Sequence, residues 1–414
     1  MLEHFYKDVT AVESLRCAPL GSHLDSFAAS LLDLAYADST ARWQLRLVAD
    51  FCRCLARDGI LATAVDGGLV DAYADERRRQ GLLRRGQQAT LARFVDHLRD
   101  KGVIPSVEPR PDESPVAGLL HRYETHLRAE RGLTTATVDN YGPFVRDLLT
   151  ERFGTEPLRL PELGPADVSS FVLRRAHSMS SGRTQLMVTT LRSFFRFLLR
   201  SGEIEADLAA CVPAVANWRL ASVPKYLEPE QIEQLLDGCD RSTSTGRRDY
   251  AILLLPARLG FRAGEVVALS LDDIDWRAGE ITVPGKGLIR DRLPMPTDVG
   301  EALVDYVQQD RPRCSSRRVF LCMKAPRRGF AGPSSVTTIV RRALERVSLD
   351  PPVKGAHILR HSLATGMLRS GASMREIGEL LRHRHPATTE IYAKVDFASL
   401  RGLAQPWPGS GGGR

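Results

Sequence analysis

The segment HILRHSLATGMLRSGASMREIGELLRHRHPATTEIY, which spans residues 357–392, gathers histidine, arginine and tyrosine in the order that decides this chain's fold. Apolar residues recur every three or four positions through its first half, a period typical of an amphipathic helix. On such a helix His357 and Arg360 stand three residues apart and share a face. A second helical stretch leads to His383, and Tyr392 follows nine residues later. The pattern predicts two helices that carry basic side chains, with Tyr392 beyond the Ala-Thr-Thr turn that follows the second helix.

The histidines of this segment do not have the neighbours of a metal site. No cysteine lies among them, and no acidic group pairs with them as in a metal cage. The seven cysteines of the chain are scattered, and only Cys52 and Cys54 lie close together, in a C-x-C spacing that suits a metal poorly. We therefore expect no metal and interpret the cysteines as reduced thiols of a cytoplasmic protein.

Length and composition indicate a folded chain of two or three domains. It has 414 residues, of which 43% are hydrophobic, and Lys and Arg outnumber Asp and Glu by 57 to 50. This excess permits a polyanionic partner, but it fits equally a protein that happens to be basic. No apolar run reaches 18 residues and the N-terminus lacks a signal sequence, so we expect no membrane contact. The glycine-rich end, PWPGSGGGR, is left out of the fold.

Two similar helical regions stand in the first half of the chain. Residues 22–60 have a strong helical period, with an expected N-cap at Ser39-Thr40 and a stop at Gly59. A comparable arrangement recurs near residue 117, and an offset of 97 residues aligns three pairs: Thr40 with Thr137, Val48 with Val145, and Asp50 with Asp147. These matches suggest two copies of one helical unit, although generic amphipathic helices also produce such matches.

A later helix, residues 184–202, carries arginines on its polar side. Arg192, Arg196 and Arg200 lie opposite its apolar residues. This face is either a solvated surface or an arginine row laid along a phosphate backbone, and the sequence favours neither.

The C-terminal half is expected to be mainly α-helical with a small β hairpin. Pro229 stands near the start of one helix, and further helices are expected over 250–260 and 264–275. Residues 275–287 and 288–296 favour two short strands around a glycine turn.

Five separated elements in one order resemble the signature of the tyrosine recombinases, the family of phage integrases and Xer-like recombinases. H-x-x-R-H, E-L-L-x-H and T-T-x-I-Y resemble its C-terminal motifs, ARLGFRAGEVVALSLDDIDW resembles its first arginine box, and PGKG resembles its lysine-bearing hairpin. The likeness covers residues 226–400 well, and residues 114–202 resemble the helical core-binding domain. Residues 1–108 are additional.

The resemblance implies a phosphoryl-transfer site built on Arg262, Arg360 and Tyr392. Tyr392 would be the nucleophile that forms a 3′-phosphotyrosine and releases a 5′-hydroxyl. The two guanidiniums would bind the non-bridging oxygens and stabilise the pentavalent transition state, because a planar, bidentate arginine suits phosphate better than lysine. The bond energy is kept in the phosphotyrosine, so neither a metal nor ATP is implied.

Four further residues receive roles from the resemblance. His357 would be the general base and Lys286 the acid that protonates the leaving oxygen. His383 would hydrogen-bond a non-bridging oxygen, and Glu265 would orient Arg262 without itself contacting the phosphate. The neighbouring His361 and His385 are interpreted as packing and surface residues.

One position departs from the family pattern. The family usually has glycine before the second histidine, but here Arg382 stands there. Glycine permits a tight left-handed turn at a helix end, whereas an arginine can end a helix by its charge and can add a phosphate contact.

The expected architecture is an N-terminal helical extension, 1–108, in which a core-binding-like repeat is considered, followed by a core-binding (SAM-like) domain, 114–203. A linker, 204–225, a catalytic domain, 226–403, and a flexible tail, 404–414, complete it. The resemblance implies a mobile-element integrase or transposase that binds double-stranded DNA as a homotetramer on two sites, alone or with related recombinases, in the cytoplasm at the nucleoid. The alternatives are a type IB-like topoisomerase, a catalytically silent DNA-binding protein and a helical interaction protein.

Overall fold

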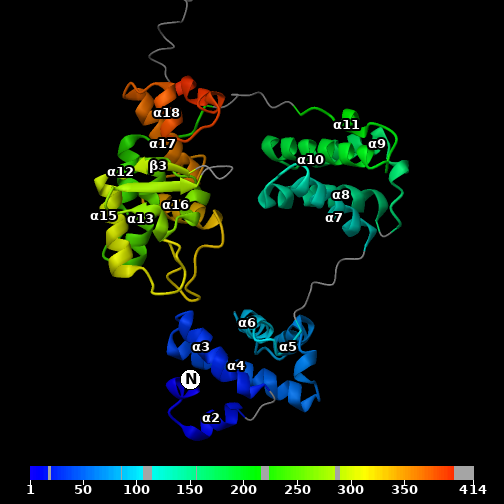
Figure 1. Ribbon diagram of the computed structural model, residues 1–414, viewed down its shortest axis with the longest axis vertical. Helices are drawn as coiled ribbons and strands as arrows, with labels where there is room; N and C mark the ends of the chain where they lie inside the picture. The colour runs from blue at the N-terminus through cyan, green and yellow to red at the C-terminus, as the bar shows by residue number, and fades with distance from the viewer. Residues whose placement is uncertain are drawn as a thin grey trace, which may run out of the picture. The chain divides into compact units, whose positions relative to one another are not determined.

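The computed structural model describes residues 1–16, 20–84, 86–105, 114–154, 156–215, 223–284 and 290–395. The described residues of Ser106–Ala221 form one compact unit, and those of Met1–Pro105 and Ser222–Arg414 form another. Each of the three regions 1–105, 114–215 and 223–395 has a hydrophobic core of its own. The mainly α-helical fold expected from the sequence is confirmed (Figure 1).

The N-terminal region is a bundle of helices. Its helices are α1 (Leu2–Phe5), α2 (Val9–Arg16), α3 (Leu24–Asp33), α4 (Asp38–Arg57), α5 (Gly67–Arg79) and α6 (Gln87–Asp100). The expected N-cap of α4 was wrong: the helix begins at Asp38, whose carboxylate in the first turn suits the positive end of the helix dipole. Gly59 ends this segment as predicted, with a left-handed φ of 68°.

The second region is also a helical bundle. Its helices are α7 (Pro115–Ala129), α8 (Thr135–Phe153), α9 (Pro165–Ala176), α10 (Ser181–Arg200) and α11 (Leu208–Cys211). The side chain of Ser114 caps α7 by accepting the backbone N–H of Ala117, and Pro115 occupies the first turn, where its missing N–H costs nothing. Phe194 and Phe195 of α10 are fully buried at the centre of this bundle.

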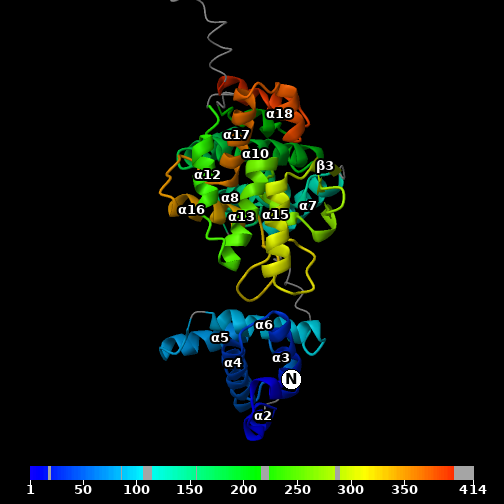
Figure 2. The ribbon, with the colours of Figure 1, turned by 90° about the vertical axis from the view of Figure 1, so that its left-hand side faces the viewer.

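The third region packs helices around one central helix, α13, most of whose residues are buried. The helices are α12 (Pro229–Asp237), α13 (Ser244–Leu259), α14 (Ala263–Ala268), α15 (Thr297–Asp305), α16 (Ser334–Arg346), α17 (Ala356–Arg369) and α18 (Met374–Leu380). A π-helical turn, Tyr306–Asp310, continues α15, and 3-10 turns at Pro386–Thr388 and Glu390–Val395 follow α18. Helix α13 packs against α15 and α17, and Figure 2 shows α13 beside α15. The two helices predicted from residues 357–392 are confirmed as α17 and α18.

A small antiparallel sheet stands on this helical region. Its strands are β1 (Ile274–Asp275), β2 (Glu280–Pro284) and β3 (Arg290–Pro294), in the order β1-β2-β3, with Ile281 of β2 opposite Leu293 of β3. The predicted hairpin is therefore confirmed. Its tip, 285–289, lies outside the described residues, and so does the predicted acid Lys286.

The helix expected over 264–275 was wrong in its second half. Helix α14 ends at Ala268, a 3-10 turn, Leu271–Asp273, follows, and strand β1 then begins. The cause is local: the backbone N–H of Ser270 donates to the Asp273 carboxylate, and the Ser270 hydroxyl accepts the N–H of Asp272. Such short polar side chains compete for the hydrogen bonds that would continue a helix.

Within the described part of the chain, no helix combines the length and the apolar character that crossing a bilayer requires. The expected tail, 404–414, lies outside the described residues.

Candidate active site

Tyr392 lies inside the protein, with its hydroxyl against a histidine. The 3-10 turn Glu390–Val395 carries the ring inward, where it is 1% exposed. The Tyr392 hydroxyl and Nδ1 of His361 are 2.8 Å apart, and the two rings meet edge to face. His361 was interpreted from the sequence as a packing residue, so this contact was missed. The available signal was its spacing: His361 follows His357 by four residues and so shares its helix face.

Two arginines face the same space as the phenol. A cavity of about 190 Å³ is lined by residues from four separate segments: Phe261, Arg262, Ala263, His357, Arg360, His361, His383, Thr388, Ile391 and Tyr392. Arg360 is 5% exposed, and its guanidinium donates to the backbone carbonyls of Gly260 and Leu381. The fold thus brings five of the six residues predicted to be catalytic to one cavity; Lys286, the sixth, is not described.

Burial and charge oppose each other at this site. Burial raises the pKa of Tyr392 to about 12, although the charges of Arg360 and Arg262 act in the opposite direction. Burial, followed by the neighbouring His357 and Arg360, lowers the pKa of His361 to about 4. At neutral pH the phenol is therefore protonated, and the imidazole beside it is neutral and able to accept a proton.

The other two predicted histidines differ in exposure. His383 is half-buried, and its Nδ1 lies 2.9 Å from the hydroxyl of Thr389. Burial, together with Arg360 and Arg262, lowers the pKa of His383 to about 4. His357 is exposed at the start of α17, with its ring 6.5 Å from that of His361.

Glu265 bonds to two arginines, Arg262 and Arg382. Its Oε1 accepts from Nη1 of Arg262 at 2.6 Å, and its Oε2 accepts the backbone N–H of Arg262 at 2.8 Å and Nη2 of Arg382 at 2.7 Å. The predicted orienting contact between Glu265 and Arg262 is therefore present. The suggested phosphate contact of Arg382 was wrong, because its side chain is only 4% exposed and turned inward.

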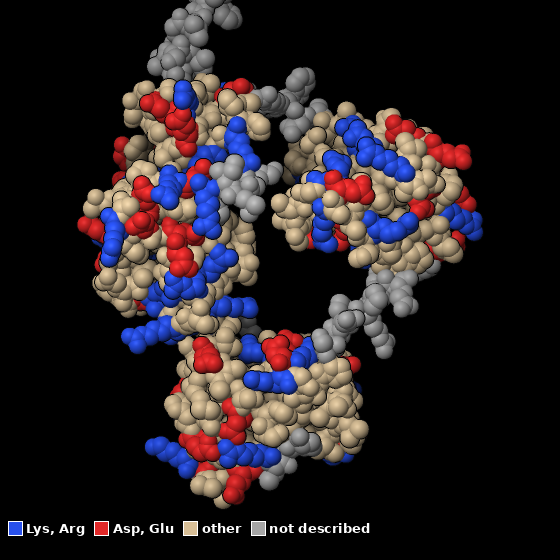
Figure 3. Space-filling view, in the orientation of Figure 1, with Lys and Arg blue, Asp and Glu red and all other residues tan. Residues whose placement is uncertain are grey.

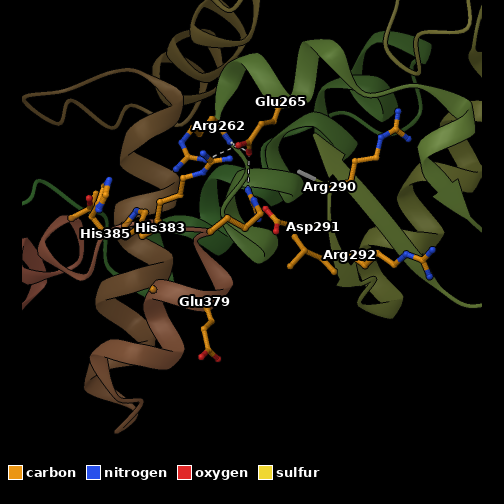
Figure 4. Close-up of a pocket in the computed structure, with 13 residues that line it drawn as sticks. Arg262, Glu265, Arg290, Asp291, Arg292, Glu379, His383 and His385 are labelled. Carbon is orange, nitrogen blue, oxygen red and sulfur yellow. Dashed lines mark hydrogen bonds and ion pairs between the residues drawn. The ribbon is translucent and has the colours of Figure 1, made fainter. Parts of the chain in front are cut away.

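Outside this cavity lies a larger, charged cleft of about 1000 Å³ between the β hairpin and the end of α18. Figure 4 shows Arg262 turned toward Glu265, and Arg290 and Arg292 projecting from the hairpin. His385 is exposed on the other wall, as predicted for a surface residue. Arg262 lines both this cleft and the smaller cavity, so an anion bound in the cleft could also contact Arg262.

The predicted DNA-binding arginines of α10 lie in the second region. Arg196 and Arg200 are exposed, whereas Arg192 is half-buried and donates to the Val212 carbonyl at 3.0 Å. Among the described residues, no three His, Cys, Asp or Glu side chains are grouped as metal ligands.

Comparison with known proteins agrees with this geometry. Residues 225–399 match the phage integrase family, and residues 120–202 match the N-terminal SAM-like domain of phage integrases. A putative integrase/recombinase, y4rA, of Sinorhizobium fredii is 45% identical over 392 residues, which cover 94% of this chain and 95% of the relative. The tyrosine recombinase XerC of Alcanivorax borkumensis is 35% identical over 289 residues, covering 68% of this chain and 90% of the relative.

A solved structure shares the fold. The crystal structure of the XerH site-specific recombinase, bound to a palindromic difH substrate in a post-cleavage complex, has a TM-score of 0.55 at 17% identity, covering 75% of this chain and 93% of that one. Fold and site define a protein of the integrase class. The chain belongs to the phage integrase family of tyrosine recombinases, which are site-specific DNA recombinases.

Proposed function

We propose that this chain is the integrase or transposase of a mobile element, which cuts and rejoins double-stranded DNA through a 3′-phosphotyrosine at Tyr392. The observation that carries this proposal is the small cavity in which the Tyr392 hydroxyl, a neutral imidazole and two guanidiniums meet. These are the groups that transfer of a phosphodiester to a phenol requires.

In the proposed reaction the Tyr392 oxygen attacks the phosphorus, and the bond from phosphorus to the 5′-oxygen breaks. The phenol proton passes to Nδ1 of His361, the nitrogen nearest the hydroxyl. This contact favours His361 over His357 as the general base and leaves His357, which lies on the same face of α17 but is exposed, to contact the phosphate. His383 donates to a non-bridging oxygen, and Lys286 remains the predicted acid for the 5′-oxygen.

Arg262 and Arg360 stabilise the transition state in this proposal. Two positive charges offset the negative charge that grows on the phosphate oxygens, and the buried site strengthens this attraction relative to water. Arg360 is fixed by two backbone carbonyls, so its guanidinium needs little reorganisation when the phosphate arrives.

A covalent-capture assay tests the reaction. A nicked duplex from the DNA that flanks the gene releases a short fragment after cleavage, so the covalent adduct accumulates. We expect a protein–DNA adduct with the wild-type chain and none with Tyr392→Phe. An adduct that persists in Tyr392→Phe contradicts the assignment of Tyr392 as the nucleophile. Relaxation of a supercoiled plasmid without strand exchange indicates the topoisomerase alternative.

We further propose that the SAM-like region binds the DNA beside the cleavage site and that four copies assemble on two sites. Support comes from the XerH structure, which is bound to its difH substrate, and from the exposed Arg196 and Arg200. The same proposal places the chain in the cytoplasm, at the nucleoid.

Residues 1–108 are proposed to be a second copy of this helical domain. An offset of 100 residues places four buried residues of α6 on identical buried residues of α10: Thr90 on Thr190, Leu91 on Leu191, Phe94 on Phe194, and Leu98 on Leu198. The packing supports the proposal, because α3 packs on α4, α4 on α6 and α5 on α6, as α7 packs on α8, α8 on α10 and α9 on α10.

The charge of this copy favours contacts with protein over contacts with DNA. Residues 1–105 contain 14 Lys and Arg and 14 Asp and Glu, and both signs mix on the face seen in Figure 3. At the same offset, Asp96 and Asp100 stand where α10 has Arg196 and Arg200. Asp96 is ion-paired with Arg99 at 2.8 Å, so this face lacks the excess of positive charge that attracts a phosphate backbone.

A further inference from the structure

Arg382 has an unusual backbone for its residue type. Its φ is 54°, in the left-handed region that favours glycine. The residue follows α18, and its backbone N–H donates to the Glu379 carbonyl at 3.0 Å, which closes the last turn. Glycine would do this without strain, so the conformation alone gives no reason for an arginine.

The side chain of Arg382 supplies that reason. It turns inward and lies over the ring of Phe261, with the guanidinium carbon 5.2 Å from the ring centroid. Nη1 donates to the carbonyls of Leu259 and Leu380 at 3.2 and 3.1 Å, and Nη2 donates to the Gly260 carbonyl at 3.3 Å and to Glu265 at 2.7 Å. Three of these five partners, Leu259, Gly260 and Phe261, run from the end of α13 into the turn that also carries Arg262.

Glu265 is the partner with a consequence for chemistry. Its side chain is 12% exposed and lies beside the guanidinium that we propose to bind the phosphate. Burial would raise the pKa of Glu265, but Arg382 and then Arg262 act more strongly together, and the pKa is lowered. The carboxylate is therefore ionised at neutral pH. Without Arg382 its negative charge would be balanced by Arg262 alone and would repel any phosphate bound to Arg262.

We propose that Arg382 is a positioning residue for DNA cleavage: it holds Glu265 in place and offsets its charge, so that Arg262 stays oriented and electrostatically free for the phosphate. This inference rests on the proposed function. It differs from a structural role in ending α18, because it predicts an effect on the chemical step that depends on Glu265.

The test measures single-turnover cleavage of the nicked duplex and, separately, its dissociation constant. Arg382→Gly restores the residue that suits the left-handed backbone and removes the guanidinium. We expect cleavage to slow about 100-fold, as for other small misplacements of catalytic groups, with the dissociation constant little changed. If Arg382 only ends the helix, this variant will cleave at the wild-type rate, which overturns the proposal.

A double variant identifies the route of the effect. In a Glu265→Gln background the charge that Arg382 offsets is absent, so adding Arg382→Gly is expected to cost less than about threefold. A full additional loss would show that Arg382 acts elsewhere and would overturn the proposal. Arg382→Lys retains the charge without the planar fork, and we expect it to recover part of the rate.

Two controls separate this effect from folding. Ser348 is another non-glycine residue with a left-handed φ, 56°, and Ser348→Gly should leave the cleavage rate unchanged. If thermal melting shows that Arg382→Gly is unfolded, Arg382→Met, which keeps an apolar stem over Phe261, takes its place; wild-type cleavage by Arg382→Met would contradict the proposal.

The two proposals fail in different ways. Absence of a Tyr392-dependent adduct with the wild-type chain would refute the proposed function. An adduct that forms equally fast in the wild type and in Arg382→Gly would refute only the role of Arg382.

Discussion

Tyr392 is held in its protonated form by the burial that shields it. With a pKa of about 12, the free phenol supplies almost no phenolate at neutral pH, so the attack that we propose for Tyr392 requires a base or a nearby positive charge. His361 lies at hydrogen-bond distance and, with a pKa of about 4, is neutral over the physiological range. A low pKa makes the imidazole a weak base, but a bound phosphate raises it by adding negative charge beside the ring.

The exchange of His361 for asparagine tests this pairing. Asparagine can still hydrogen-bond the phenol, but it cannot accept a proton. We expect His361→Asn to slow cleavage of the nicked duplex about 100-fold, within the usual range for a general base, with DNA affinity retained. His357→Asn is the comparison. A larger loss from His357→Asn than from His361→Asn would return the role of base to His357.

The same histidines make stability depend on pH. The folded-state pKa of both His361 and His383 is about 4, below the value of about 6.5 for a histidine in an unfolded chain. Between these values the unfolded chain binds more protons, so the free energy of unfolding decreases as the pH falls from 6.5 toward 4. We expect the melting temperature to fall across this window.

Substitution identifies the source of that pH dependence. In the double variant His361→Asn/His383→Asn the decline between pH 6.5 and 5 should be smaller than in the wild type, whereas exchange of the exposed His121 for asparagine should leave it unchanged. A decline of the same size in all three proteins would assign it to other groups.

At the scale of elements, α6 and α10 show how two helices with similar buried residues can expose side chains of opposite charge. Four of the six buried residues of α6 have an identical buried counterpart in α10, as expected if both helices fill the centre of a bundle. Their exposed faces are free to differ, and Asp96 and Asp100 correspond to Arg196 and Arg200. The core therefore preserves the fold while the surface determines the partner.

This contrast gives a prediction for DNA binding. Each phosphate contact contributes about one unit to the slope of log affinity against log salt. We expect Arg196→Ala/Arg200→Ala to weaken binding of duplex DNA and to reduce that slope by about two. Asp96→Ala, the matched change on α6, should alter neither quantity. An unchanged slope in the arginine variant would mean that α10 has a solvated basic face.

At the scale of the whole molecule, the separate cores predict separate unfolding. The core of 114–215 shares no residue with those of 1–105 and 223–395. Calorimetry should resolve at least two transitions. Phe194→Ala, which empties a fully buried site, should destabilise one of them by about 3–5 kcal/mol and leave the other in place. A single transition that shifts as a whole would show that the units fold together.

The sequence alone determined the helical fold, the hairpin and five of the residues that meet in the cavity. Helices and strands were predicted from periodic apolar positions, and the site residues from motifs that resemble those of a known family. Both kinds of signal can be read directly from the amino-acid sequence. Periodicity failed at the end of α14, where it predicted that the helix continues. There the side chains of Ser270 and Asp273 accept hydrogen bonds from the nearby backbone, and the helix ends.

Only the tertiary structure decided which histidine meets the phenol and where Arg382 points. His357 and His361 share one face of α17 and differ in how deeply they are buried. That difference depends on the turn Glu390–Val395, which places Tyr392 against His361. Arg382 meets Glu265 over a separation of 117 residues. Contacts of this kind arise from packing between distant segments, and no local pattern in a single sequence encodes them.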